Sequence, residues 1–507
     1  MRLYIVRGER AWIDMMNASI IMLAAIFFPI LLGVIVLAVP KFPSRNHLLA
    51  VTGAGLVITG FLAFLALRSG GAEVSLLSLG DKLEIYFCPD NLGRMFTVIA
   101  AVMWILAGAY SVEYMKHERE EKRYFGFYLM TFGALLGLDF AGNLVTYYLF
   151  YELMTLMSMP LVLHAKTKEA LMGGLKYLFY SLCGAYMVLM GLFFLGKYAT
   201  TLRFTAGGVL SGELTAGSEK VLLVVVFFMI LGFGVKAGMF PMHAWLPTAH
   251  PVAPAPASAV LSGLIVKAGV LGVVRTVYFL FGESFIRGTW VQTAWLSLTL
   301  VTIFMGSMLA YREKMIKKRL AYSTVSQVSY ILFGLALLQP QAMTGALLHV
   351  VFHAFIKAAL FLSAGAIIYK TGKANVDDMT GIGKEMPVTI WCYTFASLAL
   401  IGIPPASGFI SKWYLAQGAL SSGTGVFTWL GPVVLLISAL LTAGYLLPIT
   451  VKGFLPGADF DYENLQKKEP NLWMIVPLFI FAALSLLLGI FPNPLTEYIR
   501  GIVSTVL

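Results

Sequence analysis

Long apolar runs follow one another along almost the whole of this 507-residue chain, and they constrain its fold more than any other feature. A helix that crosses the hydrocarbon core of a bilayer needs about 20 apolar residues. We expect a spanning helix in each of fourteen runs, at about 18–39, 48–67, 92–112, 124–140, 142–163, 170–195, 221–243, 258–282, 290–311, 321–339, 343–369, 387–415, 428–451 and 471–492. The first run exceeds the apolar core of a signal peptide, so we expect it to be retained. The sequence predicts an all-α polytopic membrane protein.

The distribution of charge agrees with a membrane location. Only 12% of the residues are charged, against about 25% in soluble domains. The net charge of +11 does not indicate nucleic-acid binding, because Lys and Arg form short clusters between apolar runs, as the positive-inside rule requires. The clusters follow the odd-numbered helices, and the densest is 312–319. We therefore expect a cell (cytoplasmic) membrane location, with these loops cytoplasmic and both termini on the outer face.

The cysteines argue against a bound cofactor. Cys88, Cys183 and Cys392 are far apart and form no CxxC pair, so the chain has no motif for an iron–sulfur cluster, a structural zinc or a disulfide framework. We expect neither cofactor nor metal in this chain, and any redox chemistry would belong to another polypeptide.

Two apolar runs are interrupted by glycine and proline at comparable places. They read GFGVKAGMFPMHAWLP (Gly232–Pro247) and IGIPPASGFISKWYL (Ile401–Leu415), and each contains a lysine. Paired broken helices in two halves of a chain indicate an inverted-repeat transporter. Backbone groups freed at such breaks are tolerated at membrane depth only beside protein or water. The alternative is two ordinary proline kinks.

Ionisable residues inside the apolar runs indicate a function in moving charge. A lysine at the centre of a span costs about 2.5–3.5 kcal/mol, so we expect the buried lysines to have water, partners and a use; they are Lys236, Lys267, Lys357 and Lys412. The charge of a Glu152 carboxylate inside an apolar run needs a cation to stabilise it, and Lys236 is the predicted partner. Such a pair would form a proton switch, or alternatively a static ion pair.

The eleventh run predicts a proton relay. His349, His353 and Lys357 follow at i, i+4 and i+8, which places them on one helix face. Histidine changes charge near neutral pH and passes protons in both directions. A metal site is disfavoured, since no carboxylate or cysteine stands at suitable spacing. His243 and His250 flank the loop WLPTAHPVAPAPAS and either line a proton entrance or anchor that loop.

These motifs together resemble the antiporter-like subunits of respiratory complex I, Mrp-type Na+/H+ antiporters and membrane-bound hydrogenases. The resemblance covers about residues 124–415, in the order FYELM, KAGMFPMHAWLPTAHPVAPAPASAVLSGLIVKAGVLGVVR, KRLAYSTVSQVSYILFG, HVVFHAFIKAALFLSAG and GIPPASGFISKW. It implies a 14-helix fold with two inverted five-helix repeats and broken helices 7 and 12. It also implies a polar axis through Glu152, Lys236, Lys267, His349, His353 and Lys412. The expected segments are 1–123, 124–282 (first repeat), 283–452 (second repeat) and 453–507.

Three positions depart from the family pattern. Asn143 and Thr248 stand where acids are common, and Gln327 stands where complex I members commonly have histidine. Because glutamine cannot carry a proton as a cation, the relay would need water between Lys267 and His349.

The function we expect is ion translocation, with protons moving from the Lys236–Lys267 region through the histidines to Lys412. One hypothesis is a non-redox subunit of an electron-transfer complex, such as a membrane-bound hydrogenase or a complex I relative, with other membrane subunits as partners. The alternatives are a subunit of an Mrp-type Na+/H+ antiporter without redox partners, and a stand-alone secondary transporter. Whether the chain counts as part of an enzyme depends on which of these holds.

Overall fold

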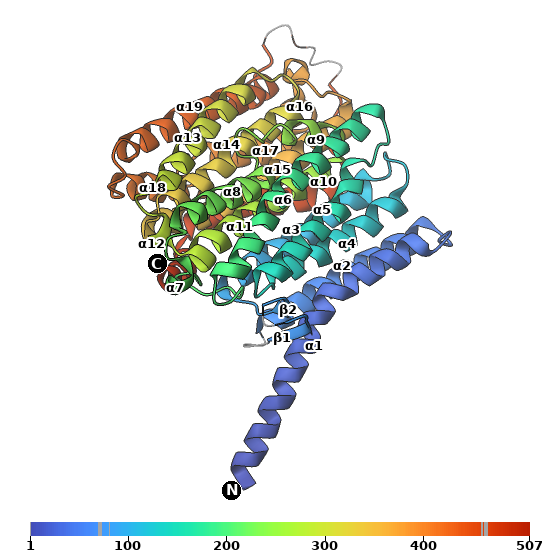
Figure 1. Cartoon of the computed structure of the whole chain (residues 1–507). Helices are drawn as coiled ribbons and strands as arrows, with labels where there is room; N and C mark the ends of the chain where they lie inside the picture. The colour runs from blue at the N-terminus through green and yellow to red at the C-terminus, as the bar shows by residue number, and fades with distance from the viewer. Residues whose placement is uncertain (1, 69–72, 81, 458–459, 461–464) are drawn as a thin grey trace.

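The computed structural model describes residues 2–68, 73–80, 82–457, 460 and 465–507, with the backbone alone for residues 2–16. Long helices run side by side and form one bundle (Figure 1). Ten helices within the described ranges are long and apolar enough to cross a membrane. The predicted all-α polytopic architecture is confirmed.

All fourteen predicted runs form helices or broken helices. Asn143 begins the fifth by accepting a hydrogen bond from the Thr146 amide at 2.8 Å, which satisfies a free N–H of the first turn. The unbroken helices are α1 (Arg2–Ala38), α2 (Arg45–Arg68), α3 (Asn91–Tyr114), α4 (Glu121–Asp139), α5 (Leu144–Val162), α6 (Lys168–Tyr198), α13 (Trp290–Arg312), α14 (Ile316–Ala336), α15 (Pro340–Thr371), α19 (Phe427–Phe454) and α20 (Leu472–Ile490).

The two predicted helix breaks are present, and each begins at a glycine in the left-handed region. Gly238 has φ +78° and Gly402 has φ +93°, a conformation that glycine adopts at little cost. At the first break the carbonyl of Val235 accepts from the Gly238 amide at 3.1 Å and from the indole of Trp245 at 2.8 Å. The elements on either side of the breaks are α8 (Glu219–Ala237) with α9 (Leu246–Val252), and α17 (Pro387–Ile401) with α18 (Ser407–Leu420).

The eighth predicted helix is fully enclosed by the rest of the bundle and is not regular. Its most apolar 18-residue window is entirely buried, as expected for a helix that is apolar all round. Two stretches are π-helical, a form that is rare and frequently found at functional sites. The successive parts are α10 (Ala255–Val260), η1 (Leu261–Ile265), α11 (Val266–Val274) and η2 (Arg275–Phe281).

A small β-hairpin, which the sequence analysis did not predict, marks one face of the bundle. Strands β1 (Val74–Ser78) and β2 (Glu84–Phe87) pair antiparallel, with Val74 opposite Phe87 and Ser78 opposite Glu84. The amide of Asn143 donates to the Glu84 carbonyl at 2.9 Å, which ties the hairpin to the start of α5. We call this side the hairpin face; α7 (Gly212–Thr215) and α12 (Glu283–Ile286) lie on it too (Figure 1).

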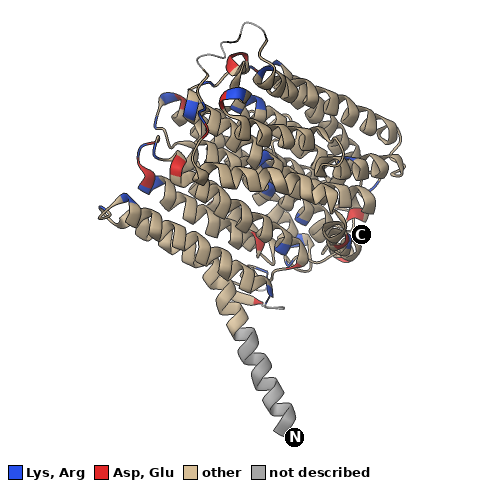
Figure 2. Ribbon diagram, turned by 180° about the vertical axis from the view of Figure 1, so that it is seen from behind, with Lys and Arg blue, Asp and Glu red and all other residues tan. Residues whose placement is uncertain are grey.

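The opposite side, which we call the basic face, carries the loops that join α1 to α2, α3 to α4 and α5 to α6. Lys and Arg gather there, and further basic residues lie inside the bundle (Figure 2). Two ion pairs hold these loops together: Arg45 with Glu121 at 2.8 Å, and Lys166 with Glu120 at 2.5 Å. The division into the segments 1–123, 124–282, 283–452 and 453–507 stays a prediction.

Candidate functional site

Lys236 lies in the last turn of α8 and is fully buried. Its Nζ atom donates to Thr155 Oγ1 at 2.8 Å, Tyr177 OH at 3.1 Å and Ser181 Oγ at 2.9 Å. It also lies 4.5 Å from the centre of the Tyr177 ring and 5.4 Å from that of Tyr151. Three acceptors satisfy the three N–H groups of an ammonium, and aromatic faces stabilise its charge further. These contacts can stabilise a protonated lysine.

The predicted direct ion pair between Glu152 and Lys236 is not formed. The ion pairs within 4 Å among the described residues do not include Glu152, and its Oε1 atom is buried without a hydrogen-bond partner. The reason is helical geometry. Tyr151 and Thr155 are four residues apart and point toward Lys236, so Glu152 is turned about 100° away from it. The two charges still interact electrostatically.

Lys267 and His353 are in direct contact at the centre of the bundle. The Nζ atom of Lys267 lies 2.6 Å from His353 Nδ1 and donates to the Ser262 carbonyl at 2.5 Å. Ser262 belongs to the π-helical stretch η1, where the altered backbone pattern frees carbonyl groups from regular helical bonds. Both side chains are fully buried. This pair has the geometry of direct proton exchange between an amine and an imidazole.

His353 and His349 both lie on α15. Together with Lys236, Lys267 and Lys412 they make up the set of residues that we call the row. Their ring centres are 5.8 Å apart, and His349 Nδ1 lies 2.8 Å from Ser411 Oγ on α18. The Nε2 atoms of both rings are buried without a partner among the described residues. Since buried polar atoms in proteins are bonded to protein or to ordered water, we expect water beside both rings. The sequence analysis expected water between Lys267 and His349; His353 fills part of that interval.

Lys412 ends the row at the second helix break. Its Nζ atom donates to the carbonyls of Leu400 and Ile401 at 2.6 and 2.9 Å. These are the last carbonyls of α17, where the helix dipole favours a positive charge. The ammonium also lies 5.2 Å from the centre of the Tyr330 ring, which stacks on His349 at 5.7 Å. Lys412 and His349 therefore share one aromatic neighbour.

Lys357 and the two remaining histidines stand apart from these contacts. Lys357 donates to the Leu320 carbonyl at 2.9 Å and bonds to no other predicted site residue. His250 is fully buried, neither of its ring nitrogens has a hydrogen-bond partner among the described residues, and its ring stacks on Phe361 at 4.8 Å. His243 is partly exposed and lies over Phe240. The structure brings neither histidine into hydrogen-bond contact with the lysines.

The central part of the chain matches one known family. The model of the family described as "NADH:quinone oxidoreductase/Mrp antiporter, TM" matches residues 141–442, a stretch that contains every residue of the row. The chain belongs to this family.

Relatives within the NADH:quinone oxidoreductase/Mrp antiporter family cover most of the chain. It is 31% identical over 415 residues to an NADH-quinone oxidoreductase subunit of Desulforudis audaxviator, covering 79% of this chain and 81% of the relative. It is 29% identical over 494 residues to an Na(+)/H(+) antiporter subunit of Bacillus subtilis, covering 95% and 97%. A chain of the Mrp complex from Dietzia sp. has the same fold, with a TM-score of 0.83, 21% identity and 97% of each chain covered.

Hydroxyl groups beside the row are part of this family member's site that sequence reasoning missed. Ser262 lies 2.7 Å from Thr324, and the Tyr445 hydroxyl donates to Ser323 at 2.7 Å. Gln327 follows Ser323 and Thr324 on the same helix. Both polar atoms of its amide group are buried without a hydrogen-bond partner among the described residues. The run AYSTVSQVS (residues 321–329) carried the signal, because five hydroxyl-bearing side chains in nine residues of a spanning helix indicate a polar lining.

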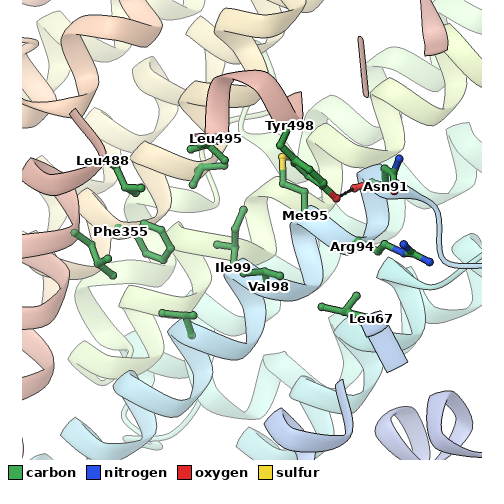
Figure 3. A pocket seen from close by; sticks show the side chains of 13 residues that line it. Leu67, Asn91, Arg94, Met95, Val98, Ile99, Phe355, Leu488, Leu495 and Tyr498 are labelled. Atoms are coloured by element: carbon green, nitrogen blue, oxygen red, sulfur yellow. Dashed lines mark hydrogen bonds between the residues drawn. The ribbon is translucent and has the colours of Figure 1, made fainter. Parts of the chain in front are cut away.

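A groove lies on the other side of α15. Its volume is about 560 Å3, and it lies between α3, α15, α20 and the amphipathic helix α21 (Asn493–Val506). Figure 3 shows its lining, which is apolar apart from Asn91, Arg94 and Tyr498 at one end. Val351 and Phe355 of α15 line it, whereas His349 and His353 face away. The helix α15 therefore separates the polar row from the groove.

Proposed function

We propose that this chain moves protons across the membrane along the row Lys236, Lys267, His353, His349 and Lys412, as the ion-translocating subunit of a multisubunit complex. The observation that carries the proposal is the 2.6 Å contact between Lys267 Nζ and His353 Nδ1 inside a fully buried core. Burying ionisable groups at membrane depth is costly and marks proton pathways. Membership of the family supports the same function.

The contact permits a balanced proton transfer. A proton on Lys267 Nζ moves to His353 Nδ1, which leaves a neutral amine and an imidazolium. The imidazolium then releases the proton on Nε2 to water, and His349 receives it on its own free Nε2. His349 passes a proton from Nδ1 to Ser411 Oγ at 2.8 Å, and the hydroxyl hands its own proton on toward Lys412. Each ring ends neutral and in the other tautomer, ready to reset by proton exchange with water.

Glu152 supplies the control of loading in this proposal. Its carboxylate and the Lys236 ammonium interact without touching, so a small displacement of α5 changes how strongly Lys236 holds its proton. Energy for that displacement comes from elsewhere in the complex. Redox-driven and antiporter complexes differ in what drives the displacement of α5. In this proposal protons enter at the basic face, and Lys357, His243 and His250 lie on the side of the row toward that entrance.

The proposed placement is the cell membrane, with the basic face cytoplasmic and both termini outside, as the positive-inside rule requires. The repeats 124–282 and 283–452 would each contribute one break and its lysine.

One relative is an NADH-quinone oxidoreductase subunit and another is an Na+/H+ antiporter subunit. Both classes of complex fit this chain, and purification from the native membrane separates them. Iron–sulfur partners identify the first class, small membrane subunits alone identify the second, and activity of the isolated chain identifies a stand-alone transporter.

The test of the function uses the whole complex in sealed vesicles. Lys236→Ala is expected to reduce proton flux by at least about 100-fold, the contribution typical of a positioned proton-transfer group. Lys220→Ala, at the exposed start of the same helix, is the matched control and should keep normal flux. Both variants should assemble, as judged by native gels. Normal flux in an assembled Lys236→Ala complex would contradict the proposal.

A further inference from the structure

Asp139, at the end of α4, is a buried carboxylate that the lysine–histidine row does not use. Its exposed fraction is 1%, and neither carboxylate oxygen has a hydrogen-bond partner among the described residues. Its close fit against α3 accounts for the burial, since a Cβ added at Gly93 would lie 2.1 Å from the Asp139 carbonyl oxygen. An ionised carboxylate without donors is strongly disfavoured in such a place. Asp139 must therefore hold a proton or bind internal water, and in both cases it can exchange a proton.

A buried cation interacts electrostatically with Asp139 and is ion-paired to Asp90 near the hairpin face. Arg275, 2% exposed in its side chain, forms a two-pronged ion pair with Asp90 at 2.5 and 2.8 Å. The Nε atom of Arg275 is buried without a partner among the described residues, and the guanidinium interacts electrostatically with Asp139. The Asp90 side chain is 35% exposed. The Asp139–Arg275–Asp90 cluster thus runs from the interior to the surface.

Two stacked tyrosines of α5 interact with Lys236 and Asp139, Tyr151 with the lysine and Tyr147 with the carboxyl group. Tyr151 lies beside the Lys236 ammonium, and its hydroxyl is buried without a partner in the described part of the chain. Tyr147, one helical turn nearer the hairpin face, stacks on Tyr151 with ring centres 6.3 Å apart. The Tyr147 hydroxyl donates to the Ala268 carbonyl at 2.5 Å, and this side chain interacts electrostatically with Asp139. A phenol both donates and accepts, so with water it relays protons without ionising.

We propose that Asp139 is a proton-relay site that joins Lys236 to the hairpin face through Tyr151 and Tyr147, giving the row a second exit that every transport cycle uses together with the exit at Lys412. This inference rests on the proposed function. In each passage one proton leaves the Lys236 ammonium and, by way of the tyrosines and water, converts the Asp139 carboxylate to the acid. The acid then releases that proton to water beside Arg275 and Asp90. The charged or titratable groups that interact with Asp139 are Arg275 from η2, which is itself paired with Asp90, and Tyr147 from α5.

The test compares three variants of the whole complex in sealed vesicles. Asp139→Asn keeps the shape but removes the exchangeable acid, and should lower flux by about 10-fold or more. Asp139→Glu should restore most of the flux. Asp378→Asn, an exposed acid on another part of the chain, is the control. Infrared difference spectra taken while the pH on the hairpin side is changed should contain a carboxylic-acid band that Asp139→Asn removes and Asp378→Asn leaves.

The outcomes separate this relay from the main function. Normal flux in Asp139→Asn together with loss in Lys236→Ala would overturn the relay alone. Normal flux in both would overturn the proposed function as well. Where Asp139→Asn fails to assemble, Tyr147→Phe decides the question, because it removes one hydroxyl and leaves the carboxylate: loss of flux supports the relay and normal flux overturns it.

Discussion

The Nζ atom of Lys267 and the Nδ1 atom of His353 lie 2.6 Å apart, although 86 residues separate them in sequence. Helices from the two predicted repeats therefore contribute one partner each to this amine–imidazole contact. Neither group has a carboxylate partner within 4 Å among the ion pairs of the described residues. We therefore expect one proton to be shared by the pair, so that when Lys267 is protonated His353 is neutral, and the reverse.

Replacement of His353 tests this contact directly. In His353→Phe a slightly larger aromatic ring remains but both nitrogens are lost, so Lys267 keeps only the Ser262 carbonyl as a partner. We expect proton flux in vesicles to fall by about 100-fold or more while the complex still assembles. His47→Phe, at an exposed position on the basic face, should leave flux unchanged. A His353→Phe complex with more than half the normal flux would contradict a role for this histidine.

The hydroxyls around Lys236 should matter in proportion to their contact. Thr155→Val removes one of the three acceptors of the ammonium and should weaken its stabilisation by about 1–2 kcal/mol, a value typical of bonds to charged groups. That corresponds to a drop in flux of about 5- to 30-fold. Thr131→Val is the matched control, because Thr131 and Thr155 make the same hydroxyl bond to the carbonyl four residues earlier, but only Thr155 contacts Lys236. Equal flux in both variants would argue against this prediction.

The glycine at the second break should be needed for the position of Lys412. Gly402 has φ +93°, and an added Cβ would lie 3.0 Å from Lys412 Cδ. Gly402→Ala should therefore displace the ammonium from the last carbonyls of α17, with a backbone strain of about 1–2 kcal/mol. Gly423→Ala carries similar strain (φ +64°) but meets nothing within 4 Å. We expect both variants to melt at lower temperature, and only Gly402→Ala to lose flux.

Acidification should loosen the hairpin. Hydrogen bonds from the Arg203 guanidinium to Glu84, at 2.6 and 3.1 Å, lower the pKa of this carboxyl. A lowered pKa means that the stabilisation is complete above the ordinary value of about 4.3 and is lost as the pH falls below it. Because Arg203 is half exposed, we expect only about 0.5 kcal/mol. Amide hydrogen exchange in β2 should be about twofold faster in Arg203→Gln than in the parent near pH 6–7, and the difference should shrink as the pH falls below about 4.3.

The sequence was most informative where a residue type has one physical use. Glycine and proline close together inside an apolar run predict an interrupted helix, and both interruptions are present, at Gly238 and Gly402. Buried lysines were equally informative, because so few environments accept them. Contacts between side chains were less predictable: the choice of Glu152 as the partner of Lys236 ignored the rotation of α5, which presents Tyr151 and Thr155 instead.

Other features had weak or no sequence signals. The π-helical stretches η1 and η2 arise from packing of a completely enclosed helix, and nothing in the composition of residues 261–265 distinguishes them from an ordinary apolar turn. The hairpin at residues 74–87 is too short for a clear alternation of apolar and polar residues. The burial of Asp139 depends on the close approach of α3 at Gly93, which is a tertiary contact between separate helices.

The two lysines at the breaks differ in what anchors them, and this decides how each can be used in the laboratory. Lys412 binds the last main-chain oxygens of α17, so its replacement removes hydrogen bonds to the backbone together with the charge. The hydrogen bonds of Lys236 Nζ go to side-chain hydroxyls, so its replacement removes no hydrogen bond between this side chain and the backbone. Position 236 is therefore the better place to install a spectroscopic probe or an unnatural amine of different basicity.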